Sequence, residues 1–195
     1  MFSFAVCAIP GCHERALTES STCYNHLNSP EEYYSRLVKL LAEGTTFKDL
    51  NLSRVAFKNV DLSNKRFYAC NFSSSTFDNC KLNKTLLRLC FFDFSCFSGC
   101  GCRETDMQSC VFAGSTISNS DFSGSDIMHT NFNGITAAFC QFSDSDLYFS
   151  RFVKSYLTSV RFIDCNLKKV NFARATMNDV SFKYSNYEEA EFEKE

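Results

Sequence analysis

A core-type side chain recurs at every fifth residue from Phe47 to Phe192 without a break in register. Among these positions only Cys102 and Ala137 are small. A second register, two residues earlier, is mostly small: Val55, Val60, Cys70, Ser75, Cys80, Cys90, Cys100, Cys110, Ser115, Ser120 and Ser125. Its exceptions are Leu50, Lys65 and Ile135. A period of five matches neither a helix, at about 3.6 residues, nor a strand, at about 2, and predicts a solenoid.

The spacing of the two registers indicates how the chain turns. In extended backbone, residues two apart point to the same side, so the small and the large residue both face inward. The remaining positions are rich in Asn, Asp, Ser and Thr, which bond to nearby backbone groups and suit tight turns. No proline follows Pro30, as expected where a stacked ladder needs its N–H groups.

Several stretches combine a small residue, Asn or Asp, and a large apolar residue: Ser120-Asp121-Phe122, Ser125-Asp126-Ile127, Cys165-Asn166-Leu167 and Val170-Asn171-Phe172. The segment 45–195 therefore resembles the pentapeptide-repeat family. The resemblance implies an all-β solenoid, a right-handed quadrilateral β-helix with twenty residues per coil. Read in steps of twenty, Leu52, Phe72 and Phe92 begin an almost continuous Phe column, which supports this period.

The first 28 residues lie outside the repeat and contain the motif Cys7-x4-Cys12-x10-Cys23-x2-His26. Three thiolates and one imidazole satisfy tetrahedral zinc, and a closed set of four is typical of a structural site. The motif resembles short treble-clef-like and knuckle-like zinc motifs. His13 is a competing ligand, but the Cys-x2-His spacing favours His26. Incidental thiols in a cysteine-rich chain are the alternative.

Residues 29–44 are expected to form a helix. Ser29 is a suitable N-cap, Pro30 suits the first turn, Glu32 would complete a capping box, and Gly44 would end the helix. Its apolar face consists of Tyr33, Tyr34, Leu37, Val38, Leu40 and Leu41. The open end of a β-helix exposes core and strand edges, so the simplest role is a lid. A helix that binds a partner or forms a dimer is the alternative.

The chain has twelve cysteines, and most of those beyond residue 44 occupy the small inward register, where a free thiol acts as a compact apolar group. Residues 1–11 lack the basic start and long apolar region of a secretory signal, and Pro10 interrupts them. No run reaches transmembrane length. We therefore predict a cytoplasmic protein with reduced thiols and no membrane association.

Charge is unevenly distributed along the repeat. Between residues 104 and 150 there are six acidic residues and no Lys or Arg: Glu104, Asp106, Asp121, Asp126, Asp144 and Asp146. Asp106, Asp126 and Asp146 are twenty apart and should stack on one edge, with the other three beside it. This acidic edge is either a by-product of Asp in the repeat motif, where it bonds local backbone, or a partner-binding stripe. Some pentapeptide-repeat proteins, including quinolone-resistance proteins, mimic DNA and bind gyrase.

Catalysis is not expected, because His129 is isolated and the sequence has no phosphate loop or nucleophile motif. We predict a non-enzymatic scaffold that binds a protein of unknown identity, with DNA-mimicking modulation of gyrase or topoisomerase as the alternative. A third hypothesis, nucleic-acid recognition by the zinc motif, is disfavoured because only Arg15 lies near it. The net charge of −2 does not favour nucleic-acid binding either, and the oligomeric state stays open.

Overall fold

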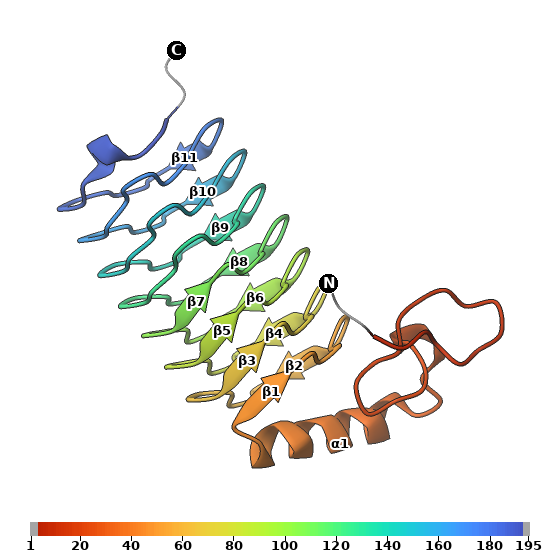
Figure 1. The fold of residues 1–195 in the computed structure, drawn as a ribbon. Helices are drawn as coiled ribbons and strands as arrows, with labels where there is room; N and C mark the ends of the chain where they lie inside the picture. Colours follow the sequence, from red (N-terminus) through yellow and green to blue (C-terminus); the bar gives the residue numbers. More distant parts are fainter. Residues whose placement is uncertain (1–3, 193–195) are drawn as a thin grey trace.

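The computed structural model describes residues 4–192 and consists of a parallel β-solenoid with one α-helix at its N-terminal end (Figure 1). The repeat from residue 45 onward forms stacked coils. The helix α1 (Pro30–Glu43) lies across the first coil, and residues 4–28 extend beside it. No helix within residues 4–192 has the length and apolarity needed to span a bilayer.

Two parallel sheets run along the solenoid. One contains β1 (Thr46–Lys48), β3 (Arg66–Tyr68), β5 (Leu86–Arg88) and β7 (Asp106–Gln108), in that order. The other contains β2 (Ala56–Lys58), β4 (Thr76–Asp78), β6 (Cys96–Ser98), β8 (Thr116–Ser118), β9 (Thr136–Ala138), β10 (Tyr156–Thr158) and β11 (Thr176–Asn178). Neighbouring strands pair at an offset of twenty residues, as Phe57 does with Phe77. The twenty-residue coil is therefore confirmed.

The remaining two faces of each coil pair through isolated parallel bridges. One series starts with Asn51 and Asn71, and the other with Asp61 and Lys81. Four pentapeptides per coil thus make four faces, as the resemblance implied.

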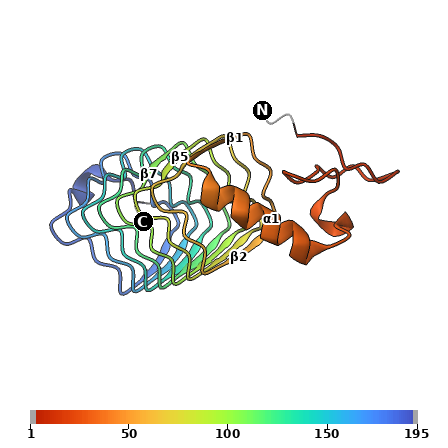
Figure 2. The same cartoon turned by 90° about the horizontal axis from the view of Figure 1, so that it is seen from below.

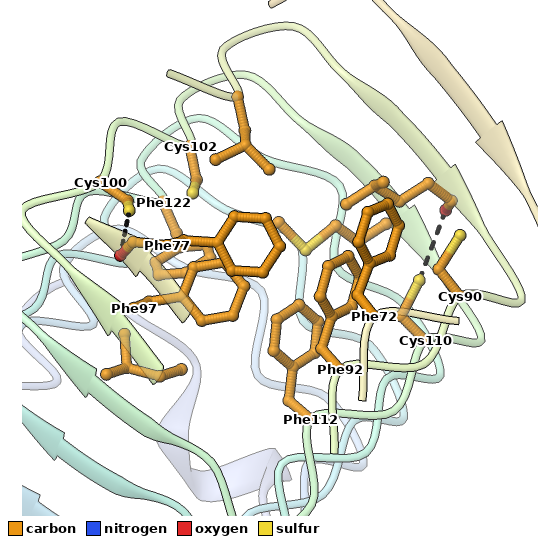
Figure 3. Close-up of a cluster of buried hydrophobic side chains, with 14 of the residues drawn as sticks. Phe72, Phe77, Cys90, Phe92, Phe97, Cys100, Cys102, Cys110, Phe112 and Phe122 are labelled. Atoms are coloured by element: carbon orange, nitrogen blue, oxygen red, sulfur yellow. Dashed lines mark hydrogen bonds between the residues drawn. The ribbon is translucent and has the colours of Figure 1, made fainter. Parts of the chain in front are cut away.

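Phenylalanine rings fill the interior in continuous stacks (Figure 3). Phe72 and Phe92 lie 4.8 Å apart between ring centroids and are parallel to within 1°. Phe77 and Phe97 form the neighbouring stack at 4.5 Å. This spacing follows from the coil height, since strands in a sheet are about 4.8 Å apart. The interior of the described coils is therefore packed with side chains.

The small inward residues bond the preceding coil. The Cys100 thiol donates to the carbonyl of Phe77 at 3.3 Å, and Ser75 donates to Leu52 at 2.9 Å. All twelve cysteines are free, and those of the inward register are buried. The prediction that these cysteines fill the core is confirmed.

Every fifth residue from Asp49 to Tyr184 has a positive φ between 50° and 69°. This residue lies two positions after the large core residue and carries the chain around each corner. Only four of these positions are glycine: Gly99, Gly114, Gly124 and Gly134. The left-handed conformation is unfavourable for other L-residues, so the stacked ladder imposes it against local preference.

The helix α1 covers the N-terminal end of the core (Figure 2). Tyr33, Leu37 and Leu41 are buried against the first coil, as predicted. The capping-box prediction was wrong, because Ser29 is the N-cap residue but its side chain makes no capping hydrogen bond. The helix is held instead by its packed face and by its C-terminal end, where Lys65 Nζ donates to the carbonyl of Gly44 at 2.8 Å.

The C-terminal end differs from the sequence expectation. Tyr187 lies in the 3-10 helix η2 (Tyr187–Glu189) and is 56% exposed, although it belongs to the large register. Phe192 stacks on Phe172 but stays 39% exposed. No coil follows these two residues within the part of the chain that the structure describes. The sequence pattern therefore continues to residue 192, but the side chains at its end are not buried.

Candidate metal centre and acidic edge

Cys7, Cys12, Cys23 and His26 come together, with one ligand atom from each within 4.8 Å of the others. His26 Nδ1 lies 3.5 Å from Cys7 Sγ and 3.3 Å from Cys23 Sγ, and the sulfurs of Cys12 and Cys23 are 3.9 Å apart. A tetrahedral zinc with its usual bond lengths separates two sulfurs by about 3.8 Å and sulfur from nitrogen by about 3.5 Å. The donor set therefore fits a metal ion of zinc size.

Tight turns on both sides of the cluster bring the four ligands together. Val6 and Arg15 form an antiparallel bridge, and the N–H of Cys7 donates to the carbonyl of Glu14 at 2.9 Å. Gly11, with φ of 79°, permits the turn that places Cys12. The 3-10 helix η1 (Tyr24–His26) follows Cys23 and turns His26 back toward it. His13 is exposed and is not part of the cluster.

The thiols of the cluster influence one another. Burial raises the pKa of Cys7, but backbone N–H groups of Cys23 and Ile9 and the His26 side chain lower it to about 6. For Cys12 the N–H of Glu14 lowers the pKa, but burial and the thiols of Cys7 and Cys23 raise it overall. Crowded thiolates repel each other, and a divalent cation would relieve that repulsion.

The segment that carries these ligands is joined to the first coil. Thr18 N donates to the carbonyl of Asn51 at 2.9 Å, and Asn51 N donates back to Thr18 Oγ1 at 2.8 Å. The buried Asn51 side chain also donates to the carbonyl of Ala16 at 2.7 Å. Leu17 packs into the common core. The sequence showed no sign of this junction, because Asn51 is an ordinary residue of the repeat motif.

The predicted acidic edge is partly neutralised. Asp106, Asp126 and Asp146 form successive bridges, so the predicted stack exists. However, Arg88 pairs with Asp106, Lys84 Nζ lies 3.4 Å from Glu104, and Arg103 Nε lies 3.5 Å from Asp121. Each of these cations comes from the preceding coil. The sequence analysis missed these ion pairs because it summed charges along stretches of the chain. Charged residues from neighbouring coils lie together on one face of the solenoid, and only that arrangement pairs them.

The remaining acidic residues differ in their surroundings. Asp144 and Asp126 are exposed. Burial, followed by the neighbouring charges of Asp106 and Asp146, raises the pKa of Asp126. Asp146 accepts hydrogen bonds from Tyr148 N and from Asn166 Nδ2, both at 2.9 Å. Asp146 therefore has a structural role that does not require a partner.

The profile of the pentapeptide repeat region matches residues 50–127 and 115–192. The chain belongs to the pentapeptide-repeat family. Its coils have the twenty-residue register described above, and residues 4–43 are an addition before the matched repeat. No curated protein sequence matches this pentapeptide-repeat protein significantly.

Solved structures similar to this pentapeptide-repeat protein include full-length QnrB1, a plasmid-mediated fluoroquinolone resistance protein. It is 16% identical, with a TM-score of 0.44, and the match covers 73% of this chain and 85% of QnrB1. HetL, involved in heterocyst differentiation regulation in Nostoc sp. strain PCC 7120, is 10% identical, with a TM-score of 0.29 and coverage of 85% and 97%. A protein of the Arabidopsis thaliana thylakoid lumen is 14% identical, with a TM-score of 0.30 and coverage of 65% and 72%.

Proposed function

We propose that this chain is a non-enzymatic binding scaffold, in which a structural zinc holds the N-terminal unit and the outer faces of the solenoid bind a protein partner. The observation that carries this proposal is a core filled by stacked Phe rings beside a closed set of four metal ligands. A filled rod presents surfaces instead of a reaction pocket. Free buried thiols suit a reducing compartment such as the cytoplasm.

Native mass spectrometry of the intact protein, before and after treatment with a chelator, tests the metal part. We expect one zinc per chain, lost with the chelator and absent from a Cys23→Ser variant. Cys96→Ser is the matched control, because Cys96 lies in β6 and outside the cluster. A wild-type protein that stays metal-free after purification with added zinc would refute the site.

Modulation of gyrase or topoisomerase by DNA mimicry is a second candidate, favoured by the stack of Asp106, Asp126 and Asp146. Ion pairs to the preceding coil reduce the charge that this edge presents. A supercoiling assay with wild type and with the triple Asp→Asn variant tests it. Inhibition that is lost in the variant supports mimicry, whereas a wild type without effect on supercoiling leaves the scaffold role alone.

A further inference from the structure

The first coil of the solenoid has strand edges with no coil before them. In the next coil, Thr76 N donates to Val55 O, and Asp78 O accepts from Asn59 N. Both groups thus point toward the preceding coil. The corresponding groups of β2, Ala56 N–H and the Lys58 carbonyl, point where a preceding coil would lie. No backbone partner meets them within residues 4–192, whereas Lys58 N donates to Tyr34 Oη at 3.3 Å.

The neighbouring face shows what this edge accepts. There the N–H and carbonyl of Asn51 point the same way, and both are paired with Thr18 of the metal-binding segment. A turn of the N-terminal segment therefore already pairs these groups on one face of the first coil, through one backbone bond and one bond to the Thr18 side chain. On the β2 face the helix α1 takes the place of a strand but leaves β2 to one side (Figure 2).

Two hollows line the β2 edge beside α1. The first, of about 370 Å³, lies between Leu27, Tyr34 and Val55 and has mainly apolar walls. The second, of about 520 Å³, lies between Val38 of α1 and Asn59 and Asp61 of the first coil. Tyr34, on α1, and Lys58, on β2, line both hollows, so the two adjoin at this pair of residues.

We propose that the β2 edge binds an extended peptide segment of a partner protein, which adds a parallel or antiparallel strand in the groove beside α1. The unpaired N–H and carbonyl groups select an extended backbone, as in other cases of strand addition. Side chains of a strand alternate, so one bulky apolar side chain would enter the hollow at Leu27 and Val55. The inference rests on the proposed scaffold function and gives that function a location.

Selection from a random linear peptide library, displayed on phage and presented with the zinc-loaded full chain, tests the proposal. We expect enriched peptides with bulky apolar residues at alternate positions. A synthetic copy should shift the backbone amide signals of Ala56 and Lys58. Methylating its backbone nitrogens should abolish binding, because the peptide then has no N–H to donate to the Lys58 carbonyl.

An Ala56→Pro substitution removes one edge donor and should weaken binding of the selected peptide about tenfold. Proline is tolerated at the first residue of an edge strand. Thr46→Pro, at the same position of β1, is the matched control and should bind as wild type does. Tyr34→Phe frees the Lys58 N–H without disturbing the fold and should keep or strengthen binding.

Several outcomes would overturn the inference. Peptides that bind Ala56→Pro as tightly as wild type would place the partner surface elsewhere and leave the scaffold function standing. Failure to enrich any peptide would count against the edge alone, because the proposed scaffold function can still use the outer faces of the solenoid. Self-association that shifts the Ala56 amide would show that a second copy occupies the groove, which refutes a separate partner.

Discussion

At the scale of single residues, the corners of the coil impose a conformation that most side chains resist. Phe139 and Phe149 have φ of 56° and 60°, and both are exposed. A left-handed conformation costs a non-glycine residue about 1 kcal/mol or more, and Asn bears it best after glycine. The parallel ladder on both sides of each corner supplies the compensating hydrogen bonds.

Phe139→Asn should therefore stabilise the protein by about 0.5–1 kcal/mol, since it relieves the corner and removes a 61% exposed ring. Chemical denaturation measures the change. Tyr156→Asn is the control, because Tyr156 is 60% exposed but lies in β10, outside the positive-φ positions. Equal effects of the two substitutions would show that the backbone conformation is not the cause.

Residues that break the repeat pattern have local explanations. Ile135 occupies a small position next to Ala137, which occupies a large one, and both are buried. The large side chain of Ile135 at the small position is compensated by the small side chain of Ala137 at the large position. Gly44 lies so close to the Phe47 ring that an added Cβ would sit 2.5 Å from it. This glycine is required for space, because its φ of −83° is available to any residue.

At the scale of elements, Lys65 connects the first coil to α1. Its Nζ donates to the carbonyls of Gly44 at 2.8 Å and Ala42 at 3.3 Å, at the end of the helix where partial negative charge accumulates. This contact explains why a lysine occupies the inward register that lies two residues before the large core residue, where most residues are small. The departure from the pattern was visible in the sequence, but its partner was not.

Lys65→Met keeps the length of the side chain and should destabilise the protein by about 1–2 kcal/mol, because the last carbonyls of α1 lose a charged donor. Thermal unfolding with residue-level hydrogen exchange measures both the size and the place of the effect. Lys81→Met, at an exposed position sixteen residues later, should change stability little. Faster exchange confined to the metal-binding segment would contradict the assigned contact.

The segment of residues 4–28, which carries the four candidate metal ligands, lies outside the repeat. Its contacts with the solenoid include the pairing of Thr18 with Asn51, the side-chain bond from Asn51 to Ala16, the packing of Leu17, and the ion pair of Glu14 with Arg54 at 3.8 Å. In a solenoid each coil contacts its neighbours, so loss of one end does not unfold the whole.

Removal of zinc should therefore release residues 4–27 while the β-solenoid persists. We expect amide protection to fall for Cys7 and Cys23 after chelation, with little change in the far-ultraviolet circular dichroism of the sheets. Asn51→Ala should produce a similar local loss even with zinc present, because the junction is broken. Complete unfolding on chelation would show that the solenoid depends on the metal.

At the scale of the whole molecule, carboxyl groups on the stacked faces make the stability of the fold depend on pH, and two of them do so in opposite directions. Burial and the charges of Asp106 and Asp146 raise the pKa of Asp126, so protonation of this group favours the folded state. The hydrogen bond from Arg161 lowers the pKa of Asp179, so its stabilising effect is present above the usual carboxyl pKa and is lost as pH falls.

Asp126→Asn and Asp179→Asn should consequently have opposite effects at pH 7. The first should raise the melting temperature by about 1–2 °C, since it removes a weak surface repulsion, and the second should lower it. The Asp126 difference should shrink already as pH falls toward the ordinary Asp pKa of 3.8, because its raised pKa lets it take up a proton there. The Asp179 difference should persist to that pH and shrink only below it, because its pKa is lowered. Melting curves from pH 3 to pH 7 test this; effects of one sign would contradict the assignment.

Much of this molecule was predictable because its structure is periodic. A five-residue repeat places the same kinds of side chain in the same positions throughout, so the inward residues follow from the sequence, whereas the twenty-residue coil was implied by the family resemblance and supported by the Phe column read at that step. The four candidate metal ligands were also identifiable, since their spacing stands outside the repeat and their chemistry is specific. Burial of Tyr187 and the capping box at Ser29 were predicted incorrectly, because both depend on what packs nearby.

Only the tertiary structure decided which residues meet across coils and at the ends. Ion pairs such as Lys84 with Glu104 join residues twenty apart, and they neutralise charges that look unpaired along the chain. Contacts of Lys65 with Gly44 and of Asn51 with Thr18 exist only where the repeat stops. The free edge of β2 has the same origin. Each coil forms backbone hydrogen bonds with the coil before it, and the first coil has no coil before it.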